Sequence, residues 1–172
     1  MATRCYLGLG SNVGDRLAHL RRAVELLAAE PGIRVVRSSR VYETEPVGGP
    51  PQPPYLNAVL EVEVELDPWG LLAACRRAEE ALGRVRDARW GPRTIDVDVL
   101  TYGDEHLSEP DLEIPHPRMH ERGFVLVPLA ELAADPPLPG GRRLAHLRLP
   151  PAAVMGVRPF APPLVAPAAG YS

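Results

Sequence analysis

Two stretches of the chain space their apolar residues as one face of an amphipathic helix does. The first ends at Pro31-Gly32 and carries its apolar face on Leu17, Leu20, Val24 and Leu27. The second runs from Trp69 to Leu82, and Asp67-Pro68 supplies a capping carboxylate and a first-turn proline just before it. The pattern therefore predicts two helices in the first half of the chain.

Four other segments favour strands. Residues 55–66 favour one of them, and in their second half Val62, Val64 and Leu66 alternate with Glu61, Glu63 and Glu65. Shorter apolar runs cover residues 4–10 and 33–42, and residues 95–100 alternate again. Together with the helices, the order is β-α-β-β-α-β. This order predicts an α+β, ferredoxin-like fold, in which an antiparallel sheet carries both helices mainly on one face.

Beyond this core the pattern weakens. We expect a short hairpin over residues 104–113 and, over residues 124–134, a short helix or a turn-rich segment broken by Pro128. The residues after 150 are rich in Pro and Ala and offer few apolar anchors. The prediction is a single domain over residues 1–150, followed by a loosely held C-terminal tail over residues 151–172.

Composition narrows the possible functions. The 172 residues carry a net charge of −3. They include no lysine, and this absence excludes Schiff-base chemistry, a lysine general base and the P-loop lysine. The whole-chain charge gives no sign of nucleic-acid binding, and we expect neither a signal peptide nor a membrane span. Cys5 and Cys75 sit in apolar surroundings. They predict buried free thiols in a reducing compartment, the cytoplasm.

The most informative segment is the strand around residue 96. Ile95, Val97 and Val99 form its apolar face, and Asp96 and Asp98 share the other face. Two carboxylates about 6.6 Å apart along a strand repel each other unless a positive group lies over them. Mg²⁺ is the obvious candidate, because it takes hard oxygen ligands and shares them with substrate phosphates. The alternative is a solvent-facing strand that happens to be acidic.

Other clusters add chemistry around this strand. Residues 83–89 carry three arginines that suit a polyphosphate, and residues 115–124 hold two histidines and two arginines. Tyr55 and Asn57 suit a flat heterocycle, because an aromatic ring stacks and an amide offers a donor and an acceptor. The glycines from Gly8 onward have a spacing one residue too long for a dinucleotide motif. We expect a tight turn there, with Asn12 bracing a neighbouring loop.

Five motifs together resemble one known family. They are Leu9-Gly10-Ser11-Asn12, Tyr42-Glu43-Thr44-Glu45-Pro46, Tyr55-Leu56-Asn57, the run from Arg89 to Asp98, and Ile114-Pro115-His116-Pro117-Arg118-Met119 with Arg122-Gly123-Phe124. Over about residues 6–134 the chain looks like 6-hydroxymethyl-7,8-dihydropterin pyrophosphokinase of folate biosynthesis. The run from Arg89 to Asp98 and the Pro-His-Pro segment are its most specific parts.

The resemblance implies an enzyme that moves a pyrophosphoryl group from ATP to the pterin hydroxymethyl group and releases AMP, with ATP binding first. It implies that Asp96 and Asp98 hold two Mg²⁺ ions and act in catalysis with Arg84 and Arg93. The implied ATP contacts are Glu79, Arg84, Arg86, Trp90, Arg93, Val99, His116, Arg118 and Arg122. The implied pterin contacts are Thr44, Val47, Tyr55, Asn57, Trp90, Asp96 and Phe124, with the pterin stacked between Tyr55 and Phe124.

Two alternatives remain open at this point. A nucleotidyltransferase with a ferredoxin-like palm also uses two strand carboxylates and two metal ions, but it releases pyrophosphate rather than AMP. A non-enzymatic sensing module of the same fold binds a small molecule and needs no acidic pair. We expect a monomer whose partners are ATP and a pterin, with neither nucleic acid nor a membrane among them.

Overall fold

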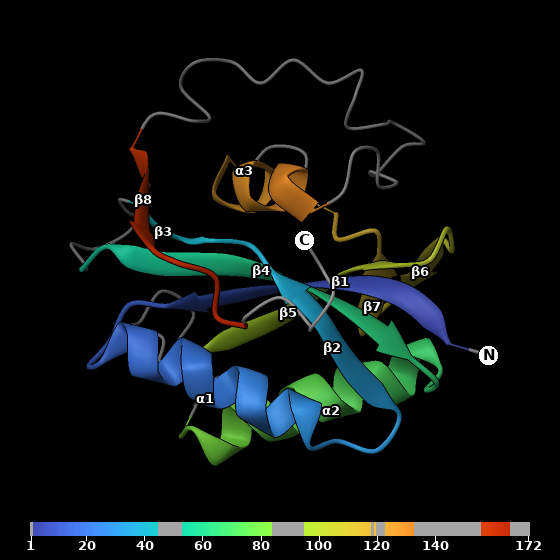
Figure 1. Cartoon of the computed structure of the whole chain (residues 1–172). Coiled ribbons are helices and arrows are strands. Elements are labelled where there is room, and N and C mark those ends of the chain that lie inside the picture. The colour runs from blue at the N-terminus through green and yellow to red at the C-terminus, as the bar shows by residue number, and fades with distance from the viewer. Residues whose placement is uncertain are drawn as a thin grey trace, which may run out of the picture.

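A six-stranded antiparallel sheet forms the centre of the molecule (Figure 1). The computed structural model describes residues 2–44, 53–83, 95–117, 119, 123–132 and 156–165. In that part of the chain the elements are β1 Thr3–Ser11, α1 Arg16–Ala28, β2 Ile33–Ser38, β3 Val41–Thr44, β4 Tyr55–Val64, α2 Pro68–Ala81, β5 Asp96–Tyr102, β6 Leu107–Glu109, β7 Leu112–Ile114, α3 Gly123–Leu132 and β8 Val157–Ala161. The sheet order is β5-β1-β4-β3-β8, with β2 also paired to β4, and β6 and β7 form a separate hairpin.

Helices cover both faces of the sheet. In Figure 1, α1 and α2 lie together below it and α3 lies above it. The lower core joins both lower helices to alternate strand positions, and it includes Leu7 of β1, Leu60 of β4 and Leu71 of α2. The upper core is smaller and packs α3 on Tyr6 and Val59. The predicted α+β, ferredoxin-like fold is confirmed, with the two expected helices on one face and a third helix on the other.

The starts of the two lower helices follow from their caps. Asp67 Oδ1 accepts a hydrogen bond from the Gly70 N–H at 2.6 Å, and Asp15 Oδ1 accepts one from the Ala18 N–H at 3.1 Å. Such carboxylates satisfy N–H groups that have no partner in the first helical turn. The helix predicted over residues 69–82 is therefore confirmed as α2. Among the described residues, no helix is both long and apolar enough to cross a membrane.

The prediction of a single strand over residues 33–42 is wrong, because this segment forms two strands, β2 and β3, which both pair with β4. At the junction the Ser39 N–H donates to the Val59 carbonyl at 2.9 Å. The Val59 N–H donates in turn to Ser39 Oγ, also at 2.9 Å. A serine hydroxyl thus takes the place of a backbone partner, and the chain leaves one strand and enters the next. Apolar alternation alone does not reveal this substitution.

The predicted break at Pro128 is also wrong, because α3 continues through it. Proline removes one N–H donor and typically costs a helix interior about 3 kcal/mol. Val125, Leu126 and Leu129 are buried between α3 and the sheet. Burying such side chains stabilises by about 1.5–3 kcal/mol each, which is enough to offset the proline. The short helix offered as the alternative for this segment is confirmed.

The C-terminal tail is not loosely held over residues 156–165, which corrects the sequence prediction. β8 pairs with β3 and forms an edge of the sheet, at the left of Figure 1. The Leu164 N–H donates to Ser38 Oγ at 3.1 Å, and Ala161, Leu164 and Val165 pack against the lower core. Backbone pairing, which hydrophobic patterning does not report, anchors this strand. The boundary predicted at residue 150 itself lies outside the described residues.

Both cysteines are free and buried, as predicted. Burial raises the pKa of the Cys5 thiol to about 12, and it raises the pKa of Cys75 as well. Only the thiolate is a strong nucleophile or metal ligand. Neither cysteine therefore contributes reactive chemistry near neutral pH.

Candidate active site

The acidic strand and the predicted pterin strand meet across one row of the sheet. Asp96 of β5 pairs with Gly10 of β1, and Gly10 pairs on its other side with Asn57 of β4. Residues directly opposite in an antiparallel pair point to the same face. Asp96 and Asn57 therefore stand on one face, two strand spacings or about 9.5 Å apart. Gly10 places no side chain between them.

Gly10 is also required by a close approach. A Cβ atom at this position would lie 2.9 Å from Asn57 Nδ2 and 3.7 Å from Tyr55 Cδ1. The first distance is shorter than a normal van der Waals contact, so any larger residue would displace the amide. Gly8, two residues earlier in β1 and opposite Asp98, is less constrained, since a Cβ there would meet Leu100 Cδ2 at 3.4 Å.

The two strand carboxylates lie on the face opposite the lower core, as the alternation predicted. Asp96 and Asp98 are partly exposed, while Val97 and Val99 between and beyond them are buried. Within the described ranges no group of three His, Cys, Asp or Glu side chains gathers around a metal position. Two carboxylates fit Mg²⁺, which is usually bound by one or two protein carboxylates together with water and substrate phosphates.

A groove of about 210 Å³ borders the acidic strand. Asp98, Val99 and His116 line it together, so two of the predicted ATP contacts lie beside a predicted metal ligand. The His116 N–H donates to the Leu100 carbonyl at 2.8 Å, which fixes the histidine segment against the end of β5. The remaining walls come from α2 and from the β6–β7 hairpin.

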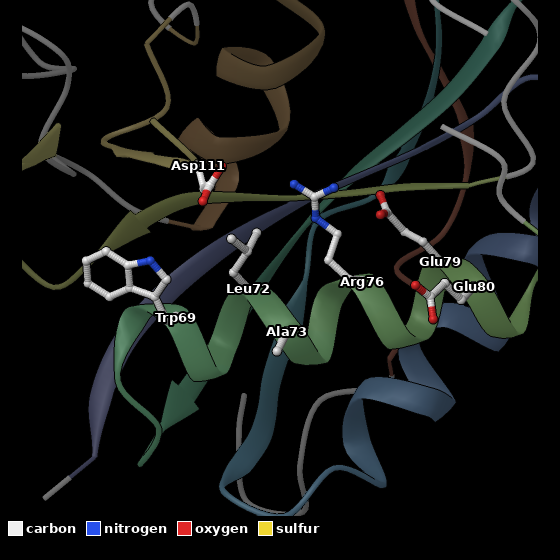
Figure 2. A pocket seen from close by; sticks show the side chains of 7 residues that line it. All are labelled: Trp69, Leu72, Ala73, Arg76, Glu79, Glu80 and Asp111. Carbon is white, nitrogen blue, oxygen red and sulfur yellow. The ribbon is translucent and has the colours of Figure 1, made fainter. Parts of the chain in front are cut away.

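A larger hollow of about 520 Å³ continues along α2 (Figure 2). Figure 2 shows Trp69, Leu72 and Arg76 rising from one side of the helix, with Asp111 opposite them. Leu72, Arg76 and Asp111 line both this hollow and the groove beside Asp98. The two hollows therefore adjoin and form one depression that runs along α2 to the acidic strand.

Glu79, a predicted ATP contact, holds the acidic strand in place. Its side chain is 1% exposed, and its Oε2 accepts a hydrogen bond from the Val97 N–H at 2.9 Å. Val97 lies between the two aspartates, on the outer side of an edge strand. A hydrogen bond to a charged acceptor is about twice as strong as one between neutral groups. This bond joins α2 to β5 between the two aspartates. The structure thus gives Glu79 a bracing role.

On the pterin side, the side chains of Thr44 and Asn57 form a buried polar pair. Thr44 Oγ1 donates to Asn57 Oδ1 at 2.8 Å. This bond orients the amide and directs its nitrogen toward Gly10, where a Cβ would collide with it. Tyr55 is partly exposed beside the pair, and Phe124 packs at the margin of the upper core. The polar pair and Tyr55 thus lie together at the start of β4.

Other residues that shape this end were missed by the sequence interpretation. Arg16, Glu43 and Arg158 form ion pairs beside Pro54, and Glu131 of α3 accepts hydrogen bonds from Tyr42 and Arg40. Charge spacing along the chain gave no signal for contacts between residues so far apart in sequence. The predicted role of Asn12 is confirmed, because its Nδ2 donates to the Pro53 carbonyl at 3.5 Å.

Seven predicted site residues lie outside the described part of the chain. They are Val47, Arg84, Arg86, Trp90, Arg93, Arg118 and Arg122. Their roles stay predictions from the sequence.

An acidic pair beside an elongated groove, at the edge strand of a ferredoxin-like sheet, is typical of enzymes that transfer phosphate groups. The family model described as 7,8-dihydro-6-hydroxymethylpterin-pyrophosphokinase (HPPK) matches residues 6–134. The chain is 56% identical over 133 residues to 2-amino-4-hydroxy-6-hydroxymethyldihydropteridine pyrophosphokinase of Methylorubrum extorquens, covering 77% of this chain and 84% of that protein. It is 47% identical over 127 residues to the Bacillus subtilis protein of the same name, covering 74% and 76%. The chain belongs to the HPPK family.

Solved structures agree on the fold. An HPPK-DHPS in complex with substrates matches with a TM-score of 0.59 at 12% identity, covering 76% of this chain and 40% of that one. A Plasmodium falciparum HPPK-DHPS with SDX-DHP matches with a TM-score of 0.64 at 15% identity, covering 86% and 45%. The chain spans less than half the length of these two proteins. At such identity the likeness concerns the fold alone.

Proposed function

We propose that this site transfers the pyrophosphoryl group of ATP to the hydroxymethyl group of 6-hydroxymethyl-7,8-dihydropterin and releases AMP. The row Asp96–Gly10–Asn57 carries the proposal, because it sets a metal-binding carboxylate and a heterocycle-binding amide on one face with a glycine between them. In the reaction the pterin oxygen forms a bond to the β-phosphorus, and the bond from that phosphorus to the α-phosphate oxygen breaks. The family membership of the chain supports the same reaction.

The nucleotide is assigned to the depression along α2. Its triphosphate lies toward Asp96 and Asp98, and the rest of the molecule extends past Val99 and His116 between α2 and the β6–β7 hairpin. Asp96 and Asp98 would hold two Mg²⁺ ions, which neutralise charge on the triphosphate and favour ionisation of the attacking hydroxyl. The protein's part is to fix the two carboxylates, and the Glu79 bond to Val97 does so.

The pterin is assigned to the start of β4. Asn57 presents a donor to the polar edge of the ring while Thr44 fixes its amide, and Tyr55 and Phe124 supply aromatic faces. In the proposed arrangement the hydroxymethyl group of the pterin would face Asp96 across Gly10. Two substrates bound side by side in the correct orientation react faster, because the entropy of bringing them together has already been lost on binding.

Further parts of the proposal rest on the sequence. Arg84, Arg86, Trp90, Arg93, Arg118 and Arg122 would bind the phosphates and cover the nucleotide, and Val47 would contact the pterin edge. We expect ATP to bind before the pterin, and we expect a monomer. A nucleotidyltransferase or a sensing module finds no support among the relatives of the chain.

The products test this function. We expect the protein, mixed with ATP, Mg²⁺ and 6-hydroxymethyl-7,8-dihydropterin, to form AMP and a pterin diphosphate in equal amounts. Phosphorus NMR and chromatography measure both products. ADP would instead indicate transfer of a single phosphate, and free pyrophosphate with a pterin–AMP adduct would indicate a nucleotidyltransferase. Pterin binding without any turnover would favour the sensing module.

A further inference from the structure

The C-terminal strand β8 lies next to β3, the strand that carries Thr44, in the same sheet. Thr44 pairs with Tyr55 on one side of β3 and with Val157 of β8 on the other. The next pair in the register sets Glu43 opposite Arg158. β8 is therefore the outer support of the pterin end of the sheet, although it lies more than a hundred residues further along the chain.

Glu43 joins three distant parts of the chain. Arg16 Nη1 of α1 donates to Glu43 Oε2 at 3.0 Å, and Arg158 Nη2 of β8 donates to Glu43 Oε1 at 2.9 Å. Both carboxylate oxygens are thus used by arginines. The hydrogen bond from Arg16 is the main cause of a lowered pKa of Glu43, ahead of the contribution of Arg158, so the carboxylate is charged at neutral pH.

Arg16 also holds the start of β4. The same Nη1 atom donates to the Pro54 carbonyl at 2.9 Å, immediately before Tyr55. On its other side the Arg16 Cζ lies 5.4 Å from the centroid of the Phe160 ring, within cation–π range. One guanidinium therefore contacts the beginning of β4, the end of β3 through Glu43, and β8.

The two ion pairs differ in solvent exposure. The side chains of Arg16 and Glu43 are 22% and 20% exposed, whereas that of Arg158 is 56% exposed. Shielded pairs with several partners contribute more than exposed ones, which are screened by water and salt. Arg16 should therefore matter more than Arg158.

We propose that Arg16, Glu43, Arg158 and Phe160 form a positioning cluster for the pterin. The cluster fixes the adjoining ends of β3 and β4, so that Thr44, Tyr55 and Asn57 hold their spacing before the pterin arrives. Such preorganisation raises affinity by lowering the ordering cost of binding. This inference rests on the proposed function, and it makes the C-terminal strand part of the substrate site.

Arg16→Met and Arg158→Met test the cluster, since methionine keeps an unbranched apolar chain and removes the charge. The pterin Kd is measured with Mg²⁺ and the unreactive analogue α,β-methylene ATP present, and the Kd of that analogue is measured separately. We expect the pterin Kd to rise about tenfold for Arg16→Met and about threefold for Arg158→Met. The nucleotide Kd should stay within about twofold, because the depression along α2 lies apart from the cluster.

Arg22→Met is the matched control. Arg22 lies on the same helix and pairs with Glu25 at 2.9 Å, but it has no described contact with β3, β4 or β8. Its pterin Kd should equal that of the unaltered protein, and Arg16→Lys should recover part of the lost affinity. An unchanged pterin Kd in both test variants overturns the proposal. An equal rise in the pterin Kd and the nucleotide Kd overturns it as well, because it indicates a purely structural role. If Arg16→Met fails to fold, Arg158→Met still decides the matter. Failure of the unaltered protein to bind the pterin would instead reject the proposed function.

Discussion

Asp96→Asn and Asp98→Asn each abolish nearly all pyrophosphoryl transfer, with an expected fall in turnover on the order of 10³-fold. Both side chains lie on the face of β5 opposite the lower core, and Asp98 lines the groove that continues along α2. Asparagine keeps the shape and one oxygen but removes the charge that binds the metal ion and its phosphates. The loss should therefore appear in turnover and in Mg²⁺-dependent nucleotide binding.

The fold of these variants should be intact, which separates their effect from simple unfolding. Asparagine has the same size as aspartate and both side chains are partly exposed, so the melting temperature of the protein without metal should change little. Mg²⁺ with nucleotide should no longer raise the melting temperature of the variants, because a ligand stabilises only the state that binds it. Asp104→Asn, an equal charge change in the exposed turn after β5, is the control. Turnover within tenfold of the unaltered protein in both variants contradicts a metal role for the pair.

Gly10→Ala should remove pterin binding while nucleotide binding survives. The new methyl group would lie 2.9 Å from Asn57 Nδ2, and the amide cannot yield without breaking its bond to Thr44. A site built to pair with polar groups loses affinity steeply when a partner is misplaced. We expect the pterin Kd to rise on the order of 10²-fold, measured by calorimetry with α,β-methylene ATP and Mg²⁺ present.

Gly8→Ala provides the comparison within the same strand. The atoms nearest to a Cβ at Gly8 belong to the Leu100 side chain, the first of them at 3.4 Å, an ordinary van der Waals distance. Its pterin Kd should stay within about threefold of that of the unaltered protein. If the two alanine variants bind the pterin equally well, Asn57 does not read the pterin edge from beside Gly10.

Much of the fold followed from local patterns. The apolar faces of α1 and α2, the Asp67 cap and the alternation in β4 and β5 each depend on residues close in sequence, and each is confirmed. The predicted positions of Asp96 and Asp98 on one strand face hold for the same reason. Local spacing decides such features before any tertiary contact forms.

The errors share a cause, since each depends on a contact between distant residues. Ser39 ends β2 because its hydroxyl bonds to Val59, and Pro128 is tolerated because α3 is buried on the sheet. β8 is held by backbone pairing to β3 and by ion pairs to Glu43. None of these contacts leaves a periodic mark in the sequence, so patterning did not predict them.

The candidate site shows the same division. The sequence analysis predicted Asp96 and Asn57 as members of two separate clusters. That both lie opposite Gly10 follows only from the pairing of β1 with β4 and β5. Glu79 was expected to brace or contact the nucleotide side; it lines the hollow along α2, and its Oε2 accepts a hydrogen bond from the Val97 N–H. The residues were thus predictable by type, and their roles required the strand pairing.

The most direct test of the account is a crystal structure with α,β-methylene ATP, Mg²⁺ and 6-hydroxymethyl-7,8-dihydropterin bound together. The account predicts metal ions on Asp96 and Asp98, the nucleotide along α2 past His116, and the pterin edge on Asn57 with its hydroxymethyl group facing the β-phosphorus. A nucleotide bound elsewhere, or a pterin whose hydroxymethyl group points away from Asp96, would contradict the central claim that both substrates meet across Gly10.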